Sequence, residues 1–234
     1  MRRLFYKGIL ADTIEIRGAD AHHLMHVMRA KPGQEVIVVD DENQVARMEM
    51  TGFTSEAVTM ELVERLDADT ESPIKLVLAM CLLKADKMDF VVQKAVELGV
   101  NRIVPIASQN CVVRYDAKKA VQRQQRWQKI ADEAAKQCGR TALVKVGPIE
   151  RLQDFLSRAC YEDDLDSEFL FCYENEAKVS VRDCLQQTIS ERYLLLIGPE
   201  GGFTLEEADA FIKAGGLSVT LGPRILRAET AAVA

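Results

Sequence analysis

The chain has 234 residues and a formal net charge of −6, a length that allows two compact domains. No apolar run approaches the roughly 20 residues that a membrane helix needs, and the first residues lead into no apolar segment of a secretory signal. The six cysteines are scattered without a Cys-x-x-Cys pair, which predicts a reduced, cytoplasmic protein whose thiols pack as small core residues.

The overall charge conceals an alternation along the chain. Residues 36–72 carry 2 basic and 10 acidic side chains, whereas residues 73–147 carry 14 basic and 6 acidic ones. Binding of nucleic acid depends on local potential, so the second block is compatible with a phosphate-binding face despite the negative total. A set of solvated helix faces would explain the same pattern equally well.

Residues 1–72 form the first predicted domain and are rich in short strands, which are typical of a small β-barrel. One helix is expected from Asp20 to Arg29, with Asp20 as its N-cap. The acidic residues 67–72 are interpreted as a linker. The strands of this domain are predicted at residues 13–16, 35–40, 44–50 and 57–63.

Residues 73–234 form the second predicted domain, in which near-continuous apolar strands alternate with helices. This pattern indicates an α/β fold with a mainly parallel sheet. Strands are predicted at residues 74–82, 102–106, 143–146, 168–173, 192–197 and 217–221. Helices are predicted at residues 87–98, 117–138, 150–160, 180–189 and 205–214. Gly99 and Gly139 follow two of them as left-handed stops, and Thr204 with Glu207 forms a capping box at the start of the last one.

Two glycine-bearing loops near the end of the chain are its most informative feature. Gly198-Pro199-Glu200-Gly201-Gly202-Phe203 follows a buried strand, and Gly222-Pro223-Arg224-Ile225-Leu226-Arg227 follows another. Ligands of open α/β sheets bind outside the carboxyl ends of the strands. Adjacent glycines let the backbone approach a ligand closely, as main-chain recognition of an adenine or ribose edge requires. The same loops could also be ordinary strand-to-helix turns.

The loops do not match the common phosphate-binding motifs. Neither ends in Gly-Lys-Ser/Thr, and no Gly-x-Gly-x-x-Gly follows a first strand. In the second loop, Arg224 and Arg227 flank the apolar pair Ile225-Leu226. Apolar side chains can pack on both faces of a flat ring while arginines bind phosphate or carboxylate. Arginines in such loops are equally often partners in surface ion pairs.

Together, Leu196–Phe203 and Leu221–Ala231 resemble the C-terminal motifs of the RsmE family. Members of this family are S-adenosylmethionine-dependent methyltransferases of the SPOUT class that modify N3 of a uridine in 16S ribosomal RNA. Lys84–Val100, Gln137–Arg140 and His22–Arg29 are similar to further family segments in the same order. The chain departs from the family at Lys136 and at Gln109-Asn110, which affects the expected RNA contacts more than the methyl-transfer assignment.

The resemblance implies an N-terminal PUA-like RNA-binding β-barrel, residues 1–72, and a C-terminal SPOUT methyltransferase domain with an α/β knot, residues 73–234. It further implies S-adenosyl-L-methionine as cofactor, 16S ribosomal RNA of the small subunit as substrate in its decoding region, and a homodimer, with no membrane and no metal. Two alternatives remain: a SPOUT methyltransferase acting on tRNA or another rRNA site, and a non-catalytic RNA-binding or ribosome-assembly factor. Intact glycine loops favour an enzyme over the binding factor.

The resemblance also carries site residues over by position. The expected cofactor contacts are Tyr173, Leu196, Ile197, Gly198, Glu200, Gly201, Gly202, Leu221, Gly222, Ile225, Leu226 and Arg227. Methyl transfer to N3 requires loss of its proton, by a base or through cationic stabilisation of the anionic ring. Arg227 is the first candidate for that stabilisation. Glu229 is a candidate base, or else a helix-dipole partner. Arg140 is a further catalytic candidate, or a cap on helix carbonyls.

Candidate RNA contacts lie in both predicted domains. His22, His23 and His26 have helical spacing, but no nearby cysteine or carboxylate completes a tetrahedral metal site, so an RNA-contacting helix is favoured. Trp127 is expected to pack in the core or at a dimer interface. The expected RNA-binding residues are His23, Arg29, Lys31, Lys84, Lys87, Gln137, Arg140 and Arg224.

Overall fold

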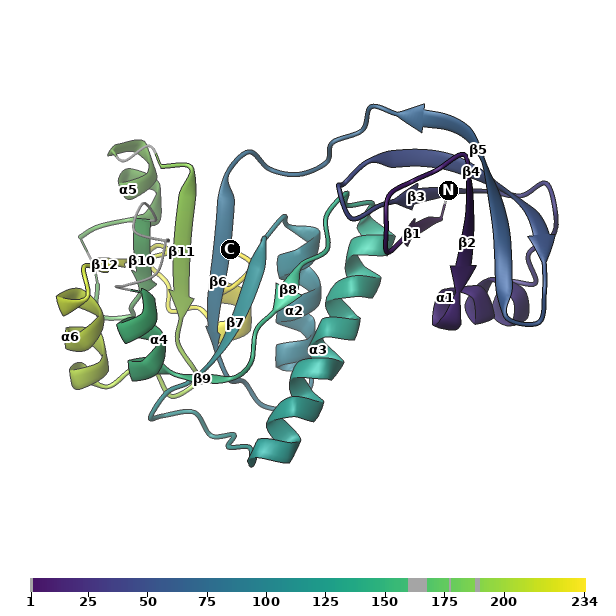
Figure 1. Ribbon diagram of the computed structural model, residues 1–234. Helices are drawn as coiled ribbons and strands as arrows, with labels where there is room; N and C mark the ends of the chain where they lie inside the picture. The colour runs from purple at the N-terminus through teal and green to yellow at the C-terminus, as the bar shows by residue number, and fades with distance from the viewer. Residues whose placement is uncertain (1, 160–167, 177, 188–189) are drawn as a thin grey trace. The chain divides into compact units, whose positions relative to one another are not determined.

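The computed structural model describes residues 2–159, 168–176, 178–187 and 190–234, whose strands form two separate sheets (Figure 1). By their contacts the residues divide into two units. The first contains residues up to Glu71 together with Ala135–Leu143, and the second contains Ser72–Ala134 and Val144–Ala234. The contact units differ from the predicted domains chiefly in the segment 135–143. No helix of the described residues is long and apolar enough to cross a membrane.

The first unit is built on a mixed sheet of five strands in the order β1-β3-β4-β5-β2. Its β1 and β3 are parallel, whereas the other neighbours are antiparallel. Side chains of β2 alternate between exposed and buried, as the period-2 pattern predicts, and one face of the sheet covers an apolar core. The strands are β1 (Arg3–Phe5), β2 (Thr13–Arg17), β3 (Glu35–Val39), β4 (Val45–Phe53) and β5 (Ala57–Leu66).

The helix of this unit differs from its prediction at both ends. It consists of α1 (Gly18–His22) followed by a π-helical turn, η1 (His23–Val27), and stops before Arg29, whose φ of 52° is left-handed. The prediction of Asp20 as N-cap is wrong, because Arg17 holds that position. The Asp20 carboxylate instead accepts a hydrogen bond from Lys136 Nζ at 2.7 Å, so it does not cap the backbone.

The second unit contains a sheet of seven strands in the order β12-β10-β11-β6-β7-β8, with β9 also paired to β7. Every recorded strand pair in it is parallel, as the predicted α/β pattern requires. The strands are β6 (Lys75–Cys81), β7 (Arg102–Ala107), β8 (Lys145–Val146), β9 (Glu150–Arg151), β10 (Glu168–Cys172), β11 (Arg192–Ile197) and β12 (Leu217–Val219).

The helices of the second unit begin and end close to their predicted positions. Gly99 and Gly139 follow α2 and α3 with φ of 95° and 82°, the left-handed stops expected after a helix. The predicted ends at residue 160 and at residues 188–189 lie outside the described residues, as does Cys160. The helices are α2 (Lys87–Glu97), α3 (Ala117–Cys138), α4 (Leu152–Ala159), α5 (Val181–Gln187), α6 (Leu205–Lys213) and α7 (Ala228–Ala231).

The end of the chain crosses the carboxyl edge of this sheet. Strand β12 lies at one end of the strand order, yet α7, which follows it, contacts α2, the helix after β6 near the middle of the sheet. The connecting residues 220–227 therefore pass the carboxyl ends of β10 and β11. A return of this kind is what the α/β knot implied by the resemblance requires.

Candidate functional site

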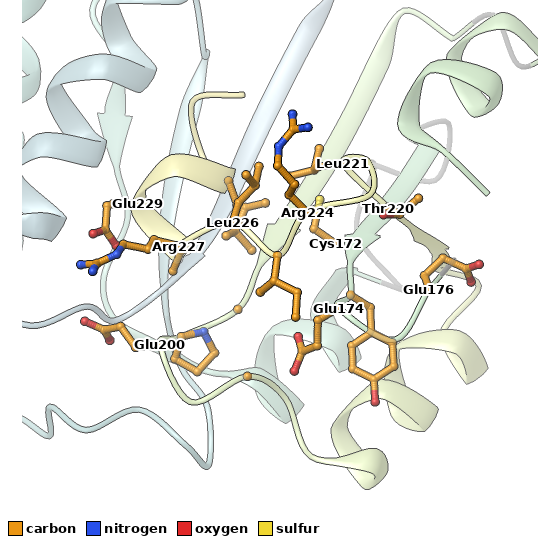
Figure 2. A pocket seen from close by; sticks show the side chains of 18 of the residues that line it. Cys172, Glu174, Glu176, Glu200, Thr220, Leu221, Arg224, Leu226, Arg227 and Glu229 are labelled. Atoms are coloured by element: carbon orange, nitrogen blue, oxygen red, sulfur yellow. The ribbon is translucent and has the colours of Figure 1, made fainter. Parts of the chain in front are cut away.

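A pocket of about 1100 Å³ lies at the carboxyl edge of the second sheet (Figure 2). Its walls come from the ends of β10 and β11 and from the segment that follows β12. Parallel strands bring their carboxyl ends to one edge, so loops far apart in the sequence meet here. The lining segments are residues 172–174, 197–202 and 219–229, with Lys87, Glu176 and Ala231 beside them.

Glycine is needed in the first loop because other groups occupy the space of a side chain. A Cβ at Gly202, which has φ of 67°, would lie 2.3 Å from Glu174 Oε1, and one at Gly198 would lie 2.7 Å from the Phe203 ring. Asn110 supports the loop from outside by donating hydrogen bonds from Nδ2 to the carbonyl oxygens of Gly201, at 3.3 Å, and Gly202, at 3.2 Å. The loop thus lines the pocket with the backbone of its three glycines beside Pro199 and Glu200, and Asn110 fixes its position.

The second loop places an apolar pair between two exposed arginines. The hydroxyl of Thr220 accepts a hydrogen bond from Gly222 N at 3.2 Å and donates one to Gly222 O at 3.0 Å, which closes the start of the loop. Ile225 is 85% exposed, an unusual state for a side chain that has only apolar surface to offer. Because it lines the pocket, it supplies an open apolar contact for a flat ligand.

Lys87 joins the first loop to α7 electrostatically. Its ammonium lies 3.2 Å from Glu200 Oε1 and 3.3 Å from Glu229 Oε2. The hydrogen bond with Glu200, followed by the contact with Glu229, raises the pKa of Lys87. Burial alone would raise the pKa of Glu200, but the Lys84 N–H and the Lys87 ammonium lower it below its usual value. Lys87 and Glu200 are therefore both charged at neutral pH.

The structure brings most of the predicted cofactor residues together. Tyr173 and the predicted members of both loops line the pocket, as do Arg224, Arg227 and Glu229. Figure 2 shows Glu200, Arg227 and Glu229 on one side of the pocket and Glu174 and Glu176 on the other. Leu196 does not line it, since its side chain is fully buried in β11.

Several predicted RNA-binding residues belong to the first unit instead. His23 is half-buried, whereas Arg29, Lys31 and Gln137 are exposed. His22 and His26 pack against each other with ring centroids 4.6 Å apart. The described residues contain no group of three or more His, Cys, Asp or Glu arranged to hold a metal. Of the two predicted lysines in the second unit, Lys84 is exposed and Lys87 is held by the pocket carboxylates.

Arg140 is buried within the first unit. Its guanidinium is paired with the Glu71 carboxylate, and their side chains are 6% and 12% exposed. Glu71 also accepts hydrogen bonds from the backbone N–H groups of Thr141 and Ala142, at 3.0 and 3.2 Å. Arg3 donates to the carbonyl oxygens of Gly139 and Arg140. The side chain of Arg140 therefore holds the segment after α3 in place, rather than being displayed to a ligand.

Sequence reasoning missed some residues that shape the pocket. Glu176 and Thr220 line it, and Asn110 holds its first loop. Glu176 and Thr220 follow strand ends, the same signal that identified the glycine loops. Asn110 gave no such signal, because its role depends on contact with a segment about ninety residues away.

The matches to known proteins agree with this architecture. The model of an RNA methyltransferase domain matches residues 70–234, and that of an RNA methyltransferase PUA domain matches residues 16–61. Ribosomal RNA small subunit methyltransferase E of Bacillus subtilis is 33% identical over 94% of this chain and 87% of its own. That of Mesomycoplasma hyopneumoniae is 31% identical over 90% of this chain and 87% of its own.

Solved structures give the same result at the level of the fold. A ribosomal RNA small subunit methyltransferase E from Neisseria gonorrhoeae, bound to S-adenosyl methionine, is 30% identical, with a TM-score of 0.88 over 100% of this chain and 94% of its own. A methyltransferase from Legionella pneumophila in complex with the cofactor SAM is 30% identical, with a TM-score of 0.87 over 99% and 93% of the two chains. Fold, pocket and family models thus define an RNA methyltransferase with a PUA domain. Within that class, the chain belongs to the ribosomal RNA small subunit methyltransferase E family.

Proposed function

We propose that the protein transfers a methyl group from S-adenosylmethionine to N3 of a uridine in the decoding region of 16S ribosomal RNA. The observation that carries this proposal is the pocket at the carboxyl edge of the second sheet. It is formed by the two motifs in which the chain resembles its family, and its first wall includes the backbone of three glycines. Such a wall suits recognition of a nucleoside by main-chain hydrogen bonds.

The residues of the pocket fit S-adenosylmethionine. Its volume of about 1100 Å³ accommodates a nucleoside with an amino-acid arm. The backbone of Ile197–Gly202 and of Leu221–Gly222 offers polar groups for the adenosine, while Ile225 and Leu226 offer apolar contacts for its ring. When bound, the cofactor supplies a sulfonium methyl group as the electrophile. The protein must hold the target nitrogen in line with that methyl, a contribution on the order of 7–11 kcal/mol in favourable cases.

Arg227 is our proposed catalytic residue. It is exposed at the pocket and immediately precedes α7, so its guanidinium can reach a base that enters from solution. Loss of the N3 proton leaves negative charge on the uracil ring, which a cation stabilises. Glu229, the candidate base, is 17% exposed and lies against Lys87, an arrangement that favours an anchoring role for it. The structure gives Arg140 a similar anchoring role through Glu71.

The RNA is proposed to contact both units. In the first, the exposed Arg29 and Lys31 and the half-buried His23 supply polar and cationic groups from the α1–η1 region, and the exposed Gln137 supplies a polar group from the end of α3. In the second, Lys84 and Arg224 are exposed. Residues 1–72 are proposed as the RNA-binding domain and residues 73–234 as the methyltransferase domain. We further propose that the protein works as a homodimer in the cytoplasm, without a metal, as the family resemblance implies.

Mapping of N3-methyluridine in ribosomal RNA tests the function directly. A strain lacking the gene should lose the modification at one position of 16S RNA, and a plasmid copy should restore it. Persistence of the modification would refute the substrate assignment and favour tRNA or another rRNA site. Calorimetric titration with S-adenosylmethionine separates an enzyme from an RNA-binding factor, because a factor without the cofactor site would release no heat.

Arg227→Ala tests the catalytic assignment. Removal of one stabilising cation should lower the rate of methyl transfer about 10²- to 10³-fold, with the fold and the unfolding temperature unchanged. Single-turnover transfer to 30S subunits from the deletion strain measures this rate, and circular dichroism checks the fold. Wild-type activity in a folded Arg227→Ala protein would remove Arg227 from the mechanism.

A further inference from the structure

Three segments that are distant in the sequence meet at Lys87. The residue is the first of α2, Glu200 belongs to the loop after β11, and Glu229 lies in α7. Glu200 Oε1 accepts a second hydrogen bond from the backbone N–H of Lys84, at 3.3 Å. The turn after β6, the first glycine loop and the last helix are therefore linked by one ammonium and two carboxylates.

Two of these segments need an external support. The turn after β6 contains Ala85 with φ of 52°, a left-handed conformation that is unfavourable for a residue with a Cβ. Such strain persists only where surrounding contacts enforce it. Helix α7 has four residues and no side-chain cap at Arg227, so it is too short to be stable by itself. Its contacts with α2 and the Lys87–Glu229 pair hold it in place.

We propose that Lys87 is a positioning residue for methyl transfer, which ties Glu200 of the cofactor loop to Glu229 of α7 and thereby sets the position of Arg227. Arg227 is two residues before Glu229, so a shift of the carboxylate moves the guanidinium with it. Without the ammonium, the carboxylates of Glu200 and Glu229 would face each other as like charges. Their repulsion would move the first glycine loop away from α7. This inference rests on the proposed function and assigns Lys87 to the pocket rather than to RNA.

Lys87→Gln removes the bridge while keeping a polar side chain of similar length. We expect both the affinity for S-adenosylmethionine and the single-turnover rate at saturating cofactor to fall about tenfold, which corresponds to roughly 1.4 kcal/mol for each. Lys87→Arg keeps the charge and should restore most of both quantities. The matched control is Lys94→Gln on the same helix, where Lys94 pairs with Glu97 at 2.7 Å and does not line the pocket.

A double-mutant cycle with Glu229→Gln distinguishes positioning from a general loss of stability. If Lys87 acts on Glu229, the double variant should lose less in cofactor affinity and rate than the sum of the two single variants. Circular dichroism and the unfolding temperature are measured on every variant. Should Lys87→Gln fail to fold, Lys87→Arg and Glu229→Gln carry the test, since Glu229→Gln must also weaken cofactor binding.

The outcomes separate this inference from the proposed function. Binding and rate in Lys87→Gln equal to those of Lys94→Gln, or strict additivity with Glu229→Gln, would overturn the positioning role while the wild-type protein still binds cofactor and methylates. Absence of cofactor binding in the wild-type protein would instead overturn the proposed function. A tenfold loss with rescue by arginine and non-additivity would support the bridge.

Discussion

Among the described residues of the second unit, Ala85 is the non-glycine residue whose backbone is left-handed. Its φ of 52° places it in the left-handed region, where a side chain costs roughly 1–2 kcal/mol. The methyl group is exposed, so it contributes little packing in return. The turn that contains Ala85 is closed by a hydrogen bond from Lys87 N to Lys84 O at 3.2 Å, and Lys84 N donates to Glu200.

Replacing Ala85 with glycine should stabilise the protein. Removal of the left-handed penalty outweighs the greater freedom of glycine in the unfolded chain, which leaves a gain of about 0.5–1 kcal/mol in the free energy of unfolding. Urea denaturation measures it. Ala120→Gly, in the regular part of α3, is the control and should lose about 1 kcal/mol. A less stable Ala85→Gly protein would show that the left-handed conformation does not strain Ala85.

Glu71 makes the stability of the first unit depend on pH. Burial would raise its pKa, but Arg140 and the N–H groups of Thr141 and Ala142 outweigh this and lower the pKa below the ordinary value of 4.5. A carboxyl whose pKa is lowered by folding stabilises the fold above its unfolded pKa. That stabilisation is lost as the pH falls below 4.5 and through the lowered value.

Glu71→Gln should therefore destabilise the protein at pH 7 and much less in acid. Leaving Arg140 without its charged partner costs about 2–3 kcal/mol at neutral pH. The difference between wild type and variant should shrink as the pH falls below 4.5, and unfolding in urea across a pH series follows it. A difference that is constant over the whole series would rule out the ionic explanation.

At the scale of elements, α6 fixes the first glycine loop through its start. Thr204 accepts a hydrogen bond from Glu207 N at 3.2 Å, and Glu207 accepts one from Thr204 N at 3.1 Å, which confirms the predicted capping box. Glu207 accepts a further bond from Gln109 N at 2.7 Å. The helix, the pocket loop and the turn that contains Asn110 are thus held by one carboxylate.

Loss of this cap should weaken both the helix and the pocket. Thr204→Ala removes one of the two reciprocal bonds and should cost about 1 kcal/mol. Glu207→Ala also releases Gln109, so we expect a larger loss and weaker binding of S-adenosylmethionine. Asp209→Ala, an exposed position of the same helix, should stay within about 0.5 kcal/mol of wild type. Equal losses in Glu207→Ala and Asp209→Ala would mean that the cap has no effect.

At the scale of the whole molecule, the uneven distribution of charge bears on RNA binding. The chain is acidic overall, yet residues 73–147 carry 14 basic and 6 acidic side chains. Some of these cations are already used within the protein, since Arg126 pairs with Asp89 at 2.6 Å. The exposed remainder, such as Lys118 and Lys119 in α3, is available for phosphates.

Affinity for ribosomal RNA should consequently fall with salt, whereas affinity for the cofactor should change little. About three phosphate contacts predict a loss of roughly one to two powers of ten between about 50 and 200 mM salt. Filter binding of a 16S fragment and calorimetry with S-adenosylmethionine, at the same salt concentrations, compare the two ligands. RNA binding that is independent of salt would show that the basic block makes no phosphate contacts.

The sequence was sufficient for those parts of the fold that depend on neighbouring residues. Strand periodicity and helix stops predicted the parallel sheet, α3 from Ala117 to Cys138 and the capping box at Thr204. It was insufficient where a partner is distant. Asp20 pairs with Lys136 and does not cap its helix, and Arg140 pairs with Glu71, a contact that no local pattern indicates. The loops of the pocket were found because strand ends converge, while the bridge at Lys87 depends on three segments that only the structure brings together.

The segment 135–143 has a consequence for the order in which the protein is made. Arg3, Asp20 and Glu71 of the first unit all bond to residues of this segment, which the ribosome adds only after most of α3. The N-terminal sheet therefore emerges first, yet its last polar partners arrive when the other unit is already partly synthesised. During synthesis we expect the sheet of the first unit to form first, while the charged groups of Arg3, Asp20 and Glu71 remain solvated. Folding of this unit is then completed only after residue 143 has left the ribosome.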